Sequence, residues 1–518
     1  MALERGIPNG KGWSDLVRVS DEKHLGEKFP QRSNPLLLLH HLSDLHICDA
    51  QSPIRPEFLD RWADPDSPIR DMAGTIGTYR PQSMLAVQVL EAMIQSLNKV
   101  TTGPLSGHPI DGAIITGDTT DNAQVNEVDW YIRVLDGGEI LPDSGSRDKY
   151  EGVADDGANH YDTKYWHPHG TPAGKENDDA RAKYGFPVVP GLLDSCRKPF
   201  DASGLKFPWY AVHGNHDALL QGTVSPEAHT QEAMVGNKRF ETLPSTMSLD
   251  QILGAFNEVG PAAYPRDSDA AYVIVTPDLD RRALERGEYA EKHLHSTGLP
   301  EGHGFSKKNV DRKTMYYATE VGGVNLIVID SVNHFGGWQG SLDVEQFEWL
   351  ENEISVSNIP CVLASHHPLS TMYNDYAPHA RRVCIDEIEA MLVKYPQVIA
   401  WLAGHEHRHH VEWVGPKIEE VGFWHIETSS LIDWPQQSRT IEIVETENKE
   451  IFIGLTIIDH AGDISYGVAE TPVEIAALSR ILSANIWQRR DSLGAKQSQD
   501  WARGEAHERN TVLRILRR

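Results

Sequence analysis

Five short polar motifs, each directly after an apolar segment, are the feature that most limits the fold of this 518-residue chain. The apolar segments have the length of buried strands, as residues 36–42, 112–116 and 209–212 illustrate. The motifs are Asp44-x-His46, Gly117-Asp118, Gly214-Asn215-His216-Asp217, His366-His367 and Gly404-His405-Glu406-His407. In an open α/β sheet, binding groups gather beyond the carboxyl ends of the strands. We therefore expect an α/β fold in which these motifs converge on one site.

The side chains in these motifs are carboxylates, imidazoles and one amide, without a thiol. Oxygen and imidazole nitrogen ligands suit manganese, iron and zinc ions. The four cysteines of the chain form no C-x-x-C pair, so neither a disulfide framework nor a thiolate zinc site is indicated. The sequence therefore favours a multinuclear metal site that is built from imidazole and carboxylate ligands.

The order D-x-H, G-D, G-N-H-D, H and G-H-x-H resembles the motif series of the calcineurin-like metallophosphoesterase superfamily. Each motif alone is common, but the complete series in order, with each motif at a strand end, carries the resemblance. It implies a cofactor of two divalent or trivalent transition metal ions (Mn, Fe or Zn). Two such ions about 3.5–4 Å apart need a shared anionic ligand to offset their mutual repulsion. The implied ligands are Asp44, His46 and His407 for one ion, Asn215, His366 and His405 for the other, and Asp118 as the bridge.

Two further residues of the G-N-H-D motif receive roles from the resemblance. His216 is expected to face the substrate, where it stabilises the transition state or protonates the leaving oxygen. Asp217 is expected to orient His216 through a hydrogen bond. Both are therefore predicted catalytic residues.

The expected fold is a four-layer α/β/β/α sandwich of two mixed sheets. The layering follows from the resemblance, whereas the strand and helix pattern alone supports only the α/β class. Apolar spacing predicts helices near residues 82–98 and 344–354. We expect an N-terminal arm over residues 1–35, a catalytic domain over 36–470 with inserts over about 136–205 and 218–320, and a C-terminal helical extension over 471–518.

The C-terminal extension begins with Thr471-Pro472-Val473-Glu474, a capping box with proline in the first turn. The helix that follows has one apolar face, which must pack on the core of the chain or on a second subunit. A homo-oligomer is therefore an open alternative.

Asp121 separates branches of the superfamily. Purple acid phosphatases have a metal-binding tyrosine at the matching place, so the aspartate of this chain excludes that branch. The G-N-H-D and H-H-P forms resemble the bacterial branch that includes cyclic-nucleotide and glycerophosphodiester phosphodiesterases. The wide gaps between motifs resemble a bacterial group with long inserts, many of whose members carry a twin-arginine export signal. These inserts are expected to form the rim of the pocket.

Several residues are candidates for substrate binding. A guanidinium fits phosphate oxygens bidentately, which makes Arg80, Arg408 and Arg439 possible clamps. His303 and His334 lie in glycine-rich stretches and are candidates to line the pocket, with an ordinary loop position as the alternative. The substrate candidates we retain are Arg80, His303, His334 and Arg408. The neighbouring His213, His367, His409 and His410 are interpreted as packing or supporting residues, and Trp434 as a packing residue.

Composition limits the possible partners. The formal charge of −27 repels polyanions, so nucleic acid polymers and anionic membranes are poor partners. No segment approaches the ~20 apolar residues that a membrane span needs. A cytoplasmic location is favoured for this chain, with export of a longer precursor as the open alternative.

We therefore expect a hydrolase that cleaves a small-molecule phosphate ester with a metal-bridging hydroxide. The motif forms slightly favour a phosphodiester, and a phosphomonoesterase is the alternative. A non-catalytic scaffold of the same fold is a remote alternative, because such relatives typically lose ligands and this chain has every motif residue.

Overall fold

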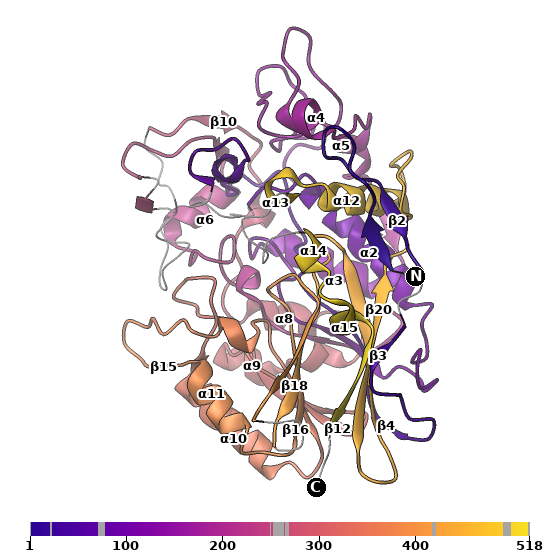
Figure 1. Cartoon of the computed structure of the whole chain (residues 1–518). Coiled ribbons are helices and arrows are strands. Elements are labelled where there is room, and N and C mark those ends of the chain that lie inside the picture. Colours follow the sequence, from indigo (N-terminus) through magenta and orange to yellow (C-terminus); the bar gives the residue numbers. More distant parts are fainter. Residues whose placement is uncertain are drawn as a thin grey trace.

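Two large β-sheets lie side by side in the lower half of the molecule as it is drawn in Figure 1. The computed structural model describes residues 2–20, 23–70, 78–248, 250–251, 264, 269–416, 421–490 and 499–515. The mixture of strands and helices confirms the α/β class. Within the described residues, no helix has the length and apolar character needed to span a membrane.

The first sheet joins both ends of the chain to the first three motif strands. Its order is β3 (Leu25–Gly26), β21 (Thr511–Ile515), β20 (Ile451–Asp459), β19 (Gln437–Glu445), β4 (Asn34–Leu42), β5 (Gly112–Ile115) and β8 (Trp209–Ala211). Strands β4, β5 and β8 are parallel neighbours, so their carboxyl ends lie along one edge. Three of the predicted motifs begin directly beyond these ends.

The second sheet carries the remaining two motifs. Its order is β11 (Tyr317–Val321), β12 (Val324–Val328), β14 (Cys361–Ala364), β16 (Val398–Ala403), β18 (Phe423–Glu427) and β17 (His410–Val414). Strands β12, β14, β16 and β18 run parallel. His366 and His405 follow β14 and β16, so the second sheet also presents its carboxyl ends to the site.

Alternate residues of β12 show how this sheet is buried on both faces. Leu326 and Val328 join the core that the first sheet shares. Ile327 faces a different core, which contains Leu350 of helix α10 (Val344–Val356) and Ile388 of helix α11 (Ile385–Leu392). The period of two along a strand thus packs one face against the other sheet and the opposite face against helices.

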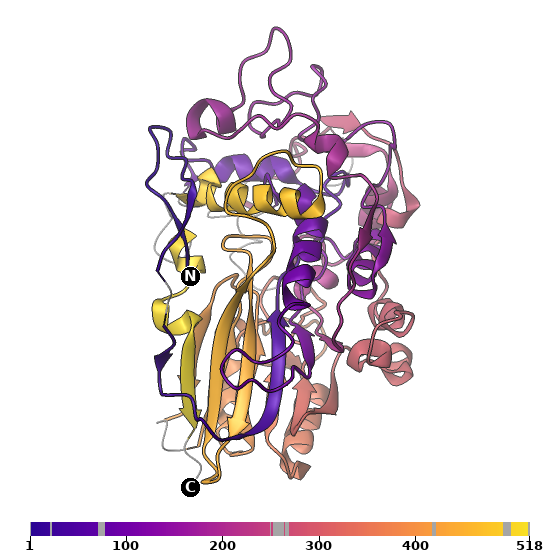
Figure 2. The same ribbon diagram turned by 90° about the vertical axis from the view of Figure 1, so that its right-hand side faces the viewer.

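Helix α2 (Ala86–Leu97) covers the first sheet and packs beside the C-terminal helix α12 (Pro472–Ala484) (Figure 2). Thr471 caps α12 through the predicted capping box, with the predicted proline in the first turn. The apolar face of α12 is buried within the chain, where Leu478 and Leu482 share a cluster with Leu85. The predicted helices near 82–98 and 344–354 are confirmed by α2 and α10.

The other helices are α3 (Val125–Asp136), α4 (Asp179–Tyr184), α5 (Leu192–Ser195), α6 (Ala228–Val235), α8 (Glu288–Leu294), α9 (Lys307–Arg312), α13 (Trp487–Arg490), α14 (Gln499–Ala502) and α15 (Ala506–Arg509). Short 3-10 helices are η1 (Glu57–Ala63), η2 (Ser83–Leu85), η3 (Asn215–Asp217), η4 (Leu279–Arg281), η5 (Glu301–Gly304) and η6 (Leu369–Thr371). Two-stranded sheets pair β1 (Leu3–Arg5) with β2 (Leu16–Arg18), β6 (Gly138–Ile140) with β7 (Phe200–Ala202), β9 (Lys238–Phe240) with β10 (Tyr272–Ile274), and β13 (Leu342–Asp343) with β15 (Arg382–Val383).

The two chain ends differ from the expectation. The segment predicted as a C-terminal helical extension is not helical throughout, because Thr511–Ile515 forms strand β21 between β20 and β3. Pairing satisfies the backbone groups that β20 would otherwise leave at a sheet edge. Residues 491–498 and 516–518 of that prediction, and residues 249, 252–263 and 265–268 of the second predicted insert, lie outside the described residues.

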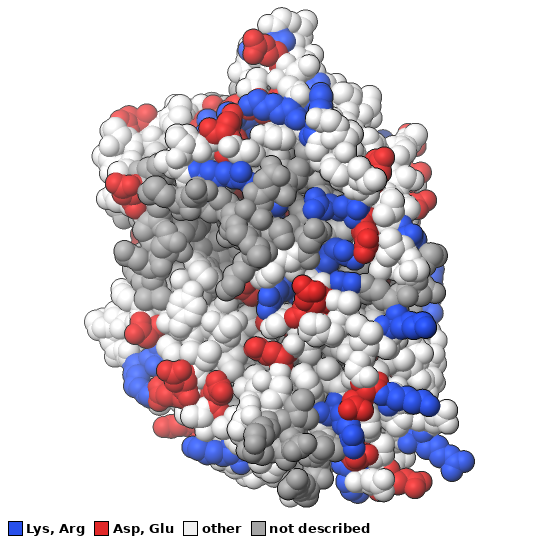
Figure 3. All heavy atoms as spheres, viewed as in Figure 1, with Lys and Arg blue, Asp and Glu red and all other residues white. Residues whose placement is uncertain are grey.

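The surface carries charges of both signs. On the face seen in Figure 3, lysine and arginine side chains alternate with aspartate and glutamate over the described part of that face.

Candidate metal centre

The predicted ligands come together where the carboxyl ends of the two sheets meet. Asp44 lies beyond the end of a strand of the first sheet, and His405 lies beyond the end of a strand of the second. The backbone amide of His405 donates to Asp44 Oδ2 at 3.0 Å. Gly404 permits this close approach, since a Cβ atom there would lie 1.7 Å from Ser43 Oγ. Close packing against Ser43 therefore explains why the G-H-x-H motif has a glycine at position 404.

The first group of ligands consists of Asp44, His46 and His407, whose candidate ligand atoms all lie within 4.8 Å of one another. His407 Nε2 lies 3.3 Å from Asp44 Oδ1 and 3.2 Å from His46 Nε2. Ligands bound to one ion at about 2.0–2.2 Å stand roughly 2.9–3.5 Å apart. These separations therefore fit three ligands of one metal ion.

The second group contains His366 and His405, with His366 Nε2 3.1 Å from His405 Nδ1. Asp118 lies between the groups, because its Oδ2 is 3.1 Å from His366 Nε2 and 3.6 Å from His46 Nε2. Its other oxygen, Oδ1, accepts the backbone amide of His216 at 2.8 Å. Asp118 thus has the position that a bridging carboxylate requires.

Asn215 supplies the clearest sign of a missing partner. Its Nδ2 donates to the carbonyl of Gly222 at 2.9 Å, which fixes the orientation of the amide. Its Oδ1 is buried without a hydrogen-bond partner. A buried polar oxygen without a partner costs about 1–3 kcal/mol. A metal ion bound to Oδ1 would remove this cost, so the donor set fits the metal centre that the motifs imply.

The backbone at these ligands is strained. A positive φ angle is uncommon in residues other than glycine, and such residues cluster at functional sites. The left-handed φ angles are 51° at Asp44, 43° at His46, 48° at Asp118, 70° at His405 and 55° at His407. Ligands directly after strand ends therefore turn sharply toward the centre instead of continuing the strand.

Oxygen acceptors hold the imidazoles from the side away from the centre. His46 Nδ1 lies 3.1 Å from Asp121 Oδ1, and His366 Nδ1 lies 2.8 Å from the carbonyl of Thr116. Such contacts set the tautomer that leaves Nε2 to the metal. Asp121, at the position that separates branches of the superfamily, thus supports His46.

His407 is supported by a carboxylate that the sequence did not reveal. Its Nδ1 lies 2.7 Å from Asp433 Oδ2, and Asp433 also accepts from Arg80 Nε at 3.0 Å and from Arg489 Nη1 at 2.8 Å. The local sequence around Asp433 does not predict this role, because its partners lie far away in the sequence. Arg80, predicted as a phosphate clamp, therefore commits its Nε to the support of His407.

Charge in the cluster shifts the imidazole pKa values. Burial lowers the pKa of His407, but the Asp44 and Asp433 carboxylates outweigh this effect and raise it to about 9. Burial likewise lowers the pKa of His366, and Asp118 raises it to about 9. The carboxylates therefore favour positive charge at this place, which a metal ion would provide.

His216 lies beside the proposed ligands, with its ring 4.5 Å from that of His46. Its Nδ1 lies 2.8 Å from the carbonyl of Asp121, so a backbone oxygen orients it. The prediction that Asp217 orients His216 through a hydrogen bond is therefore wrong. Asp217 accepts from Thr119 Oγ1 at 2.7 Å and from the Gly214 amide at 2.9 Å, and thereby ties two motif loops together.

The predicted pocket residues have different outcomes. The prediction that His303 lines the pocket is wrong. Its ring is buried and stacked on Trp209 with the ring centroids 3.2 Å apart, and its Nε2 lies 2.7 Å from Ser296 Oγ. Arg408 is half-buried, with its guanidinium over the Trp501 ring at 4.9 Å, and stays a prediction.

Three further side chains near the motifs are buried in packing or supporting positions, namely Arg439, Trp434 and His367. Arg439, weighed as a clamp, is fully buried and donates to the carbonyl of Glu427 at 2.7 Å. Trp434 is fully buried, as a packing residue should be. Both ring nitrogens of His367 have partners, Ser331 Oγ at 2.8 Å and the Trp338 carbonyl at 2.9 Å, so it is not available as a ligand.

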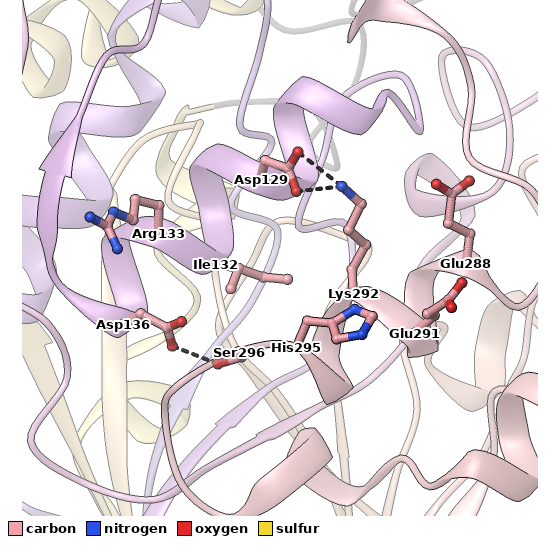
Figure 4. A pocket seen from close by; sticks show the side chains of 9 residues that line it. All are labelled: Asp129, Ile132, Arg133, Asp136, Glu288, Glu291, Lys292, His295 and Ser296. Atoms are coloured by element: carbon pink, nitrogen blue, oxygen red, sulfur yellow. Dashed lines mark hydrogen bonds and ion pairs between the residues drawn. The ribbon is translucent and has the colours of Figure 1, made fainter.

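A hollow of about 410 Å³ lies between α3 and α8 (Figure 4). Its lining includes Asp129 and Lys292, and the lysine Nζ already lies 2.7 Å from Asp129 Oδ1. None of the lining residues is a predicted ligand or catalytic residue. This hollow is therefore not the site that the motifs define.

Residues 190–409 match the family model for calcineurin-like phosphoesterases, so this part of the chain is similar to that family. The matched range includes Asn215, His366, His405 and His407, whereas Asp44, His46 and Asp118 precede it.

Solved structures give distant similarities. A dimetal phosphatase from Danio rerio is 11% identical with a TM-score of 0.36, and the alignment covers 82% of this chain and 97% of that one. A sulfate thiohydrolase, SoxB, from Thermus thermophilus in complex with glycerol is 11% identical with a TM-score of 0.30, over 83% of this chain and 58% of that one. A comparison with curated proteins gave no match.

Proposed function

We propose that this chain hydrolyses a small phosphate ester at a centre of two transition metal ions, chosen from Mn, Fe and Zn. The ligands are Asp44, His46, Asp118, Asn215, His366, His405 and His407. The observation that carries the proposal is the position of Asp118 Oδ2, 3.1 Å and 3.6 Å from imidazoles of the two groups. These residues would hold the two ions, which when bound would supply an activated hydroxide and would draw charge from the phosphate oxygens.

The residues of the chain prepare the site for this chemistry. Asp118 keeps one oxygen for the centre, since its other oxygen is held by the His216 amide. Asp44 is held in the same way by the His405 amide. Because these contacts hold both carboxylates before substrate binds, the site requires little rearrangement during the reaction.

His216 is the proposed proton donor to the leaving oxygen. Its Nδ1 is directed to the Asp121 carbonyl, which leaves Nε2 for the substrate. The side chain is 17% exposed, so the ring reaches solvent from a largely buried position. A protonated imidazole that gives up its Nε2 proton would neutralise the alkoxide as the ester bond breaks.

The finer assignment is a phosphodiester, with a phosphomonoester as the alternative. A flat wall stands beside the centre, because the Trp338 ring is stacked on His405 with centroids 5.7 Å apart. Tyr373, whose ring lies 6.1 Å from that of Trp338, is 43% exposed. Such aromatic surface suits a second, uncharged ester arm better than a terminal dianionic phosphate.

A comparison of two model esters tests this assignment. Protein stripped of metal and protein reloaded with Mn, Fe or Zn would be assayed with bis(p-nitrophenyl) phosphate and p-nitrophenyl phosphate. We expect turnover only after reloading, and faster cleavage of the diester. Faster cleavage of the monoester would assign a phosphatase instead. Equal turnover with and without metal would contradict the proposed chemistry altogether.

A Trp338→Ala variant is the matched control for the aromatic wall. Loss of the Trp338 ring should raise KM for the diester more than KM for the monoester, because only the diester has a second aryl arm. Equal changes for both esters would remove Trp338 from the account of specificity.

A further inference from the structure

A third cluster of metal-ligating side chains lies outside the proposed dinuclear centre. It consists of His213, directly before the G-N-H-D motif, Asp330, shortly after β12, and His334. The candidate ligand atoms of these three residues lie within 4.8 Å of one another. Like the ligands of the dinuclear centre, His213 and Asp330 follow the carboxyl ends of parallel strands, β8 and β12.

The spacing in this cluster is wider than that of a hydrogen bond between an imidazole and a carboxylate. Asp330 Oδ1 lies 3.5 Å from His213 Nδ1, and Asp330 Oδ2 lies 3.4 Å from His334 Nε2. For comparison, the hydrogen-bonded pair of His407 and Asp433 has a separation of 2.7 Å. Charge-assisted hydrogen bonds normally have donor–acceptor distances of about 2.7–2.9 Å.

The same spacing does match that between ligands of the proposed dinuclear centre. His407 Nε2 lies 3.3 Å from Asp44 Oδ1, and His46 Nε2 lies 3.6 Å from Asp118 Oδ2. Two atoms that share one ion at about 2.0–2.2 Å stand roughly 2.9–3.5 Å apart. Each oxygen of Asp330 thus faces an imidazole nitrogen at the distance that separates two ligand atoms of one metal ion.

The charge of Asp330 gives an independent indication. This carboxylate is 5% exposed, and its ion-pair partners in the described part of the chain are the two histidines of the cluster, with no lysine or arginine. A further contact comes from the backbone amide of Val332, 3.2 Å from Oδ1. Burial of a carboxylate costs free energy unless the charge is paired with a cation, coordinates a metal or accepts enough hydrogen bonds.

Three other buried carboxylates, Asp121, Asp44 and Asp118, can be compared with Asp330. Asp121, which supports a ligand, is paired with the guanidinium of Arg55. Asp44 and Asp118, the proposed metal ligands, have ion-pair contacts to histidines alone within the described residues. Asp330 shares the environment of the proposed ligands rather than that of the supporting carboxylate.

The cluster also has a way in for an ion. His213 and Asp330 are buried, whereas the His334 side chain is 20% exposed. An ion would therefore reach the cluster past His334.

We propose that His213, Asp330 and His334 bind a third metal ion, separate from the dinuclear centre. Two imidazoles and one carboxylate are a ligand set that suits divalent zinc. Three protein ligands leave one coordination position open to an anionic ligand, as in catalytic zinc sites. This site does not depend on the proposed function, because its ligands are not shared with the dinuclear centre.

Zinc stoichiometry tests the proposal. Metal-free protein would be loaded with zinc, dialysed and analysed for zinc per chain by mass spectrometry. We expect about one equivalent less zinc in His334→Ala than in the wild-type chain, whatever the total. His295→Ala, which removes an exposed histidine of the α3–α8 hollow, is the matched control and should bind as much zinc as the wild type.

A second variant guards against a change in folding. His334→Gln keeps a side chain of similar size, and its melting temperature would be compared with that of the wild type. Loss of one equivalent in both variants supports the third site. Zinc content equal to the wild type in either folded variant would overturn it. The zinc that remains in the variants reports on the dinuclear centre, so failure of one proposal is distinguishable from failure of the other.

Discussion

At the scale of single residues, the site depends on oxygen atoms behind its imidazoles as much as on the ligands themselves. Asp121 and Asp433 each accept from the Nδ1 side of a proposed ligand, at 3.1 Å from His46 and 2.7 Å from His407. Arginines hold both carboxylates in turn. A ligand whose ring is fixed in this way loses little entropy when a metal binds.

Removing the charge from Asp433 should weaken the metal centre without removing a ligand. We expect Asp433→Asn to reduce metal affinity by about 10–100-fold, because His407 loses its charged acceptor. Competition with a chelator would measure the affinity of the wild type and the variant. Asp162→Asn, at a half-exposed carboxylate that pairs with Arg61, is the matched control. An affinity equal to that of the wild type would show that Asp433 does not support the centre.

His216 should behave differently from the ligands. We expect His216→Ala to keep its metal and lose about 10²–10⁴-fold in turnover, the usual size of an acid–base contribution. Asp118→Ala is the contrasting variant, because it should lose metal and turnover together. Metal content and turnover would be measured on the same preparations. Turnover close to the wild-type value in His216→Ala would rule out the proposed proton transfer.

The clustering of the proposed ligands could be predicted from the sequence, whereas the residues that support them could not, for the same physical reason. Asp44 and His405 directly follow strands, so a local pattern places them at the edge of a sheet. Asp433 lies 26 residues from His407, and only the fold brings them together. His303 shows the opposite error, because its glycine neighbours suggested a loop while the ring stacks on Trp209 in the core.

At the scale of elements, the C-terminal segment is part of the fold that carries the proposed site. Arg489 of α13 binds Asp433, and Glu508 of α15 contacts His410, which opens β17. Strand β21 completes the first sheet. Its short alternating sequence was hidden in a charged tail, and its pairing with β20 and β3 depends on partners far away in the chain.

The contact between His410 and Glu508 should make stability depend on pH. Burial lowers the pKa of His410, but hydrogen bonds to Glu412 and Glu508 outweigh it and raise the pKa to about 9 from an ordinary value of 6.5. The protonated form is therefore favoured by folding, so this contribution is complete below about pH 6.5 and is lost as the pH rises through about 9.

Chemical denaturation of the wild type and His410→Gln at several pH values would measure this effect. We expect the wild type to lose about 1–2 kcal/mol of unfolding free energy relative to the variant between about pH 6 and pH 10. The variant serves as the control because other titrating groups are common to both proteins. Parallel pH curves would contradict this role of His410.

At the scale of the whole molecule, two sheets direct their parallel strands at one place. The α/β class and the motif positions followed from strand ends in the sequence, whereas the order of strands and the pairing of both chain ends depend on long-range contacts. The amide of Leu431 donates to the carbonyl of Asp44 at 3.1 Å, and that of Gly404 to the carbonyl of His366 at 3.0 Å. The two sheets therefore bring the proposed metal ligands together.

Anomalous diffraction from crystals of the protein reloaded with zinc is the most direct test of this account. We predict two neighbouring peaks about 3.5–4 Å apart on either side of Asp118. One should contact Asp44, His46 and His407, and the other Asn215, His366 and His405. Loaded protein with no peak at these ligands, or with a single peak that leaves Asn215 Oδ1 without a partner, would contradict the dinuclear centre.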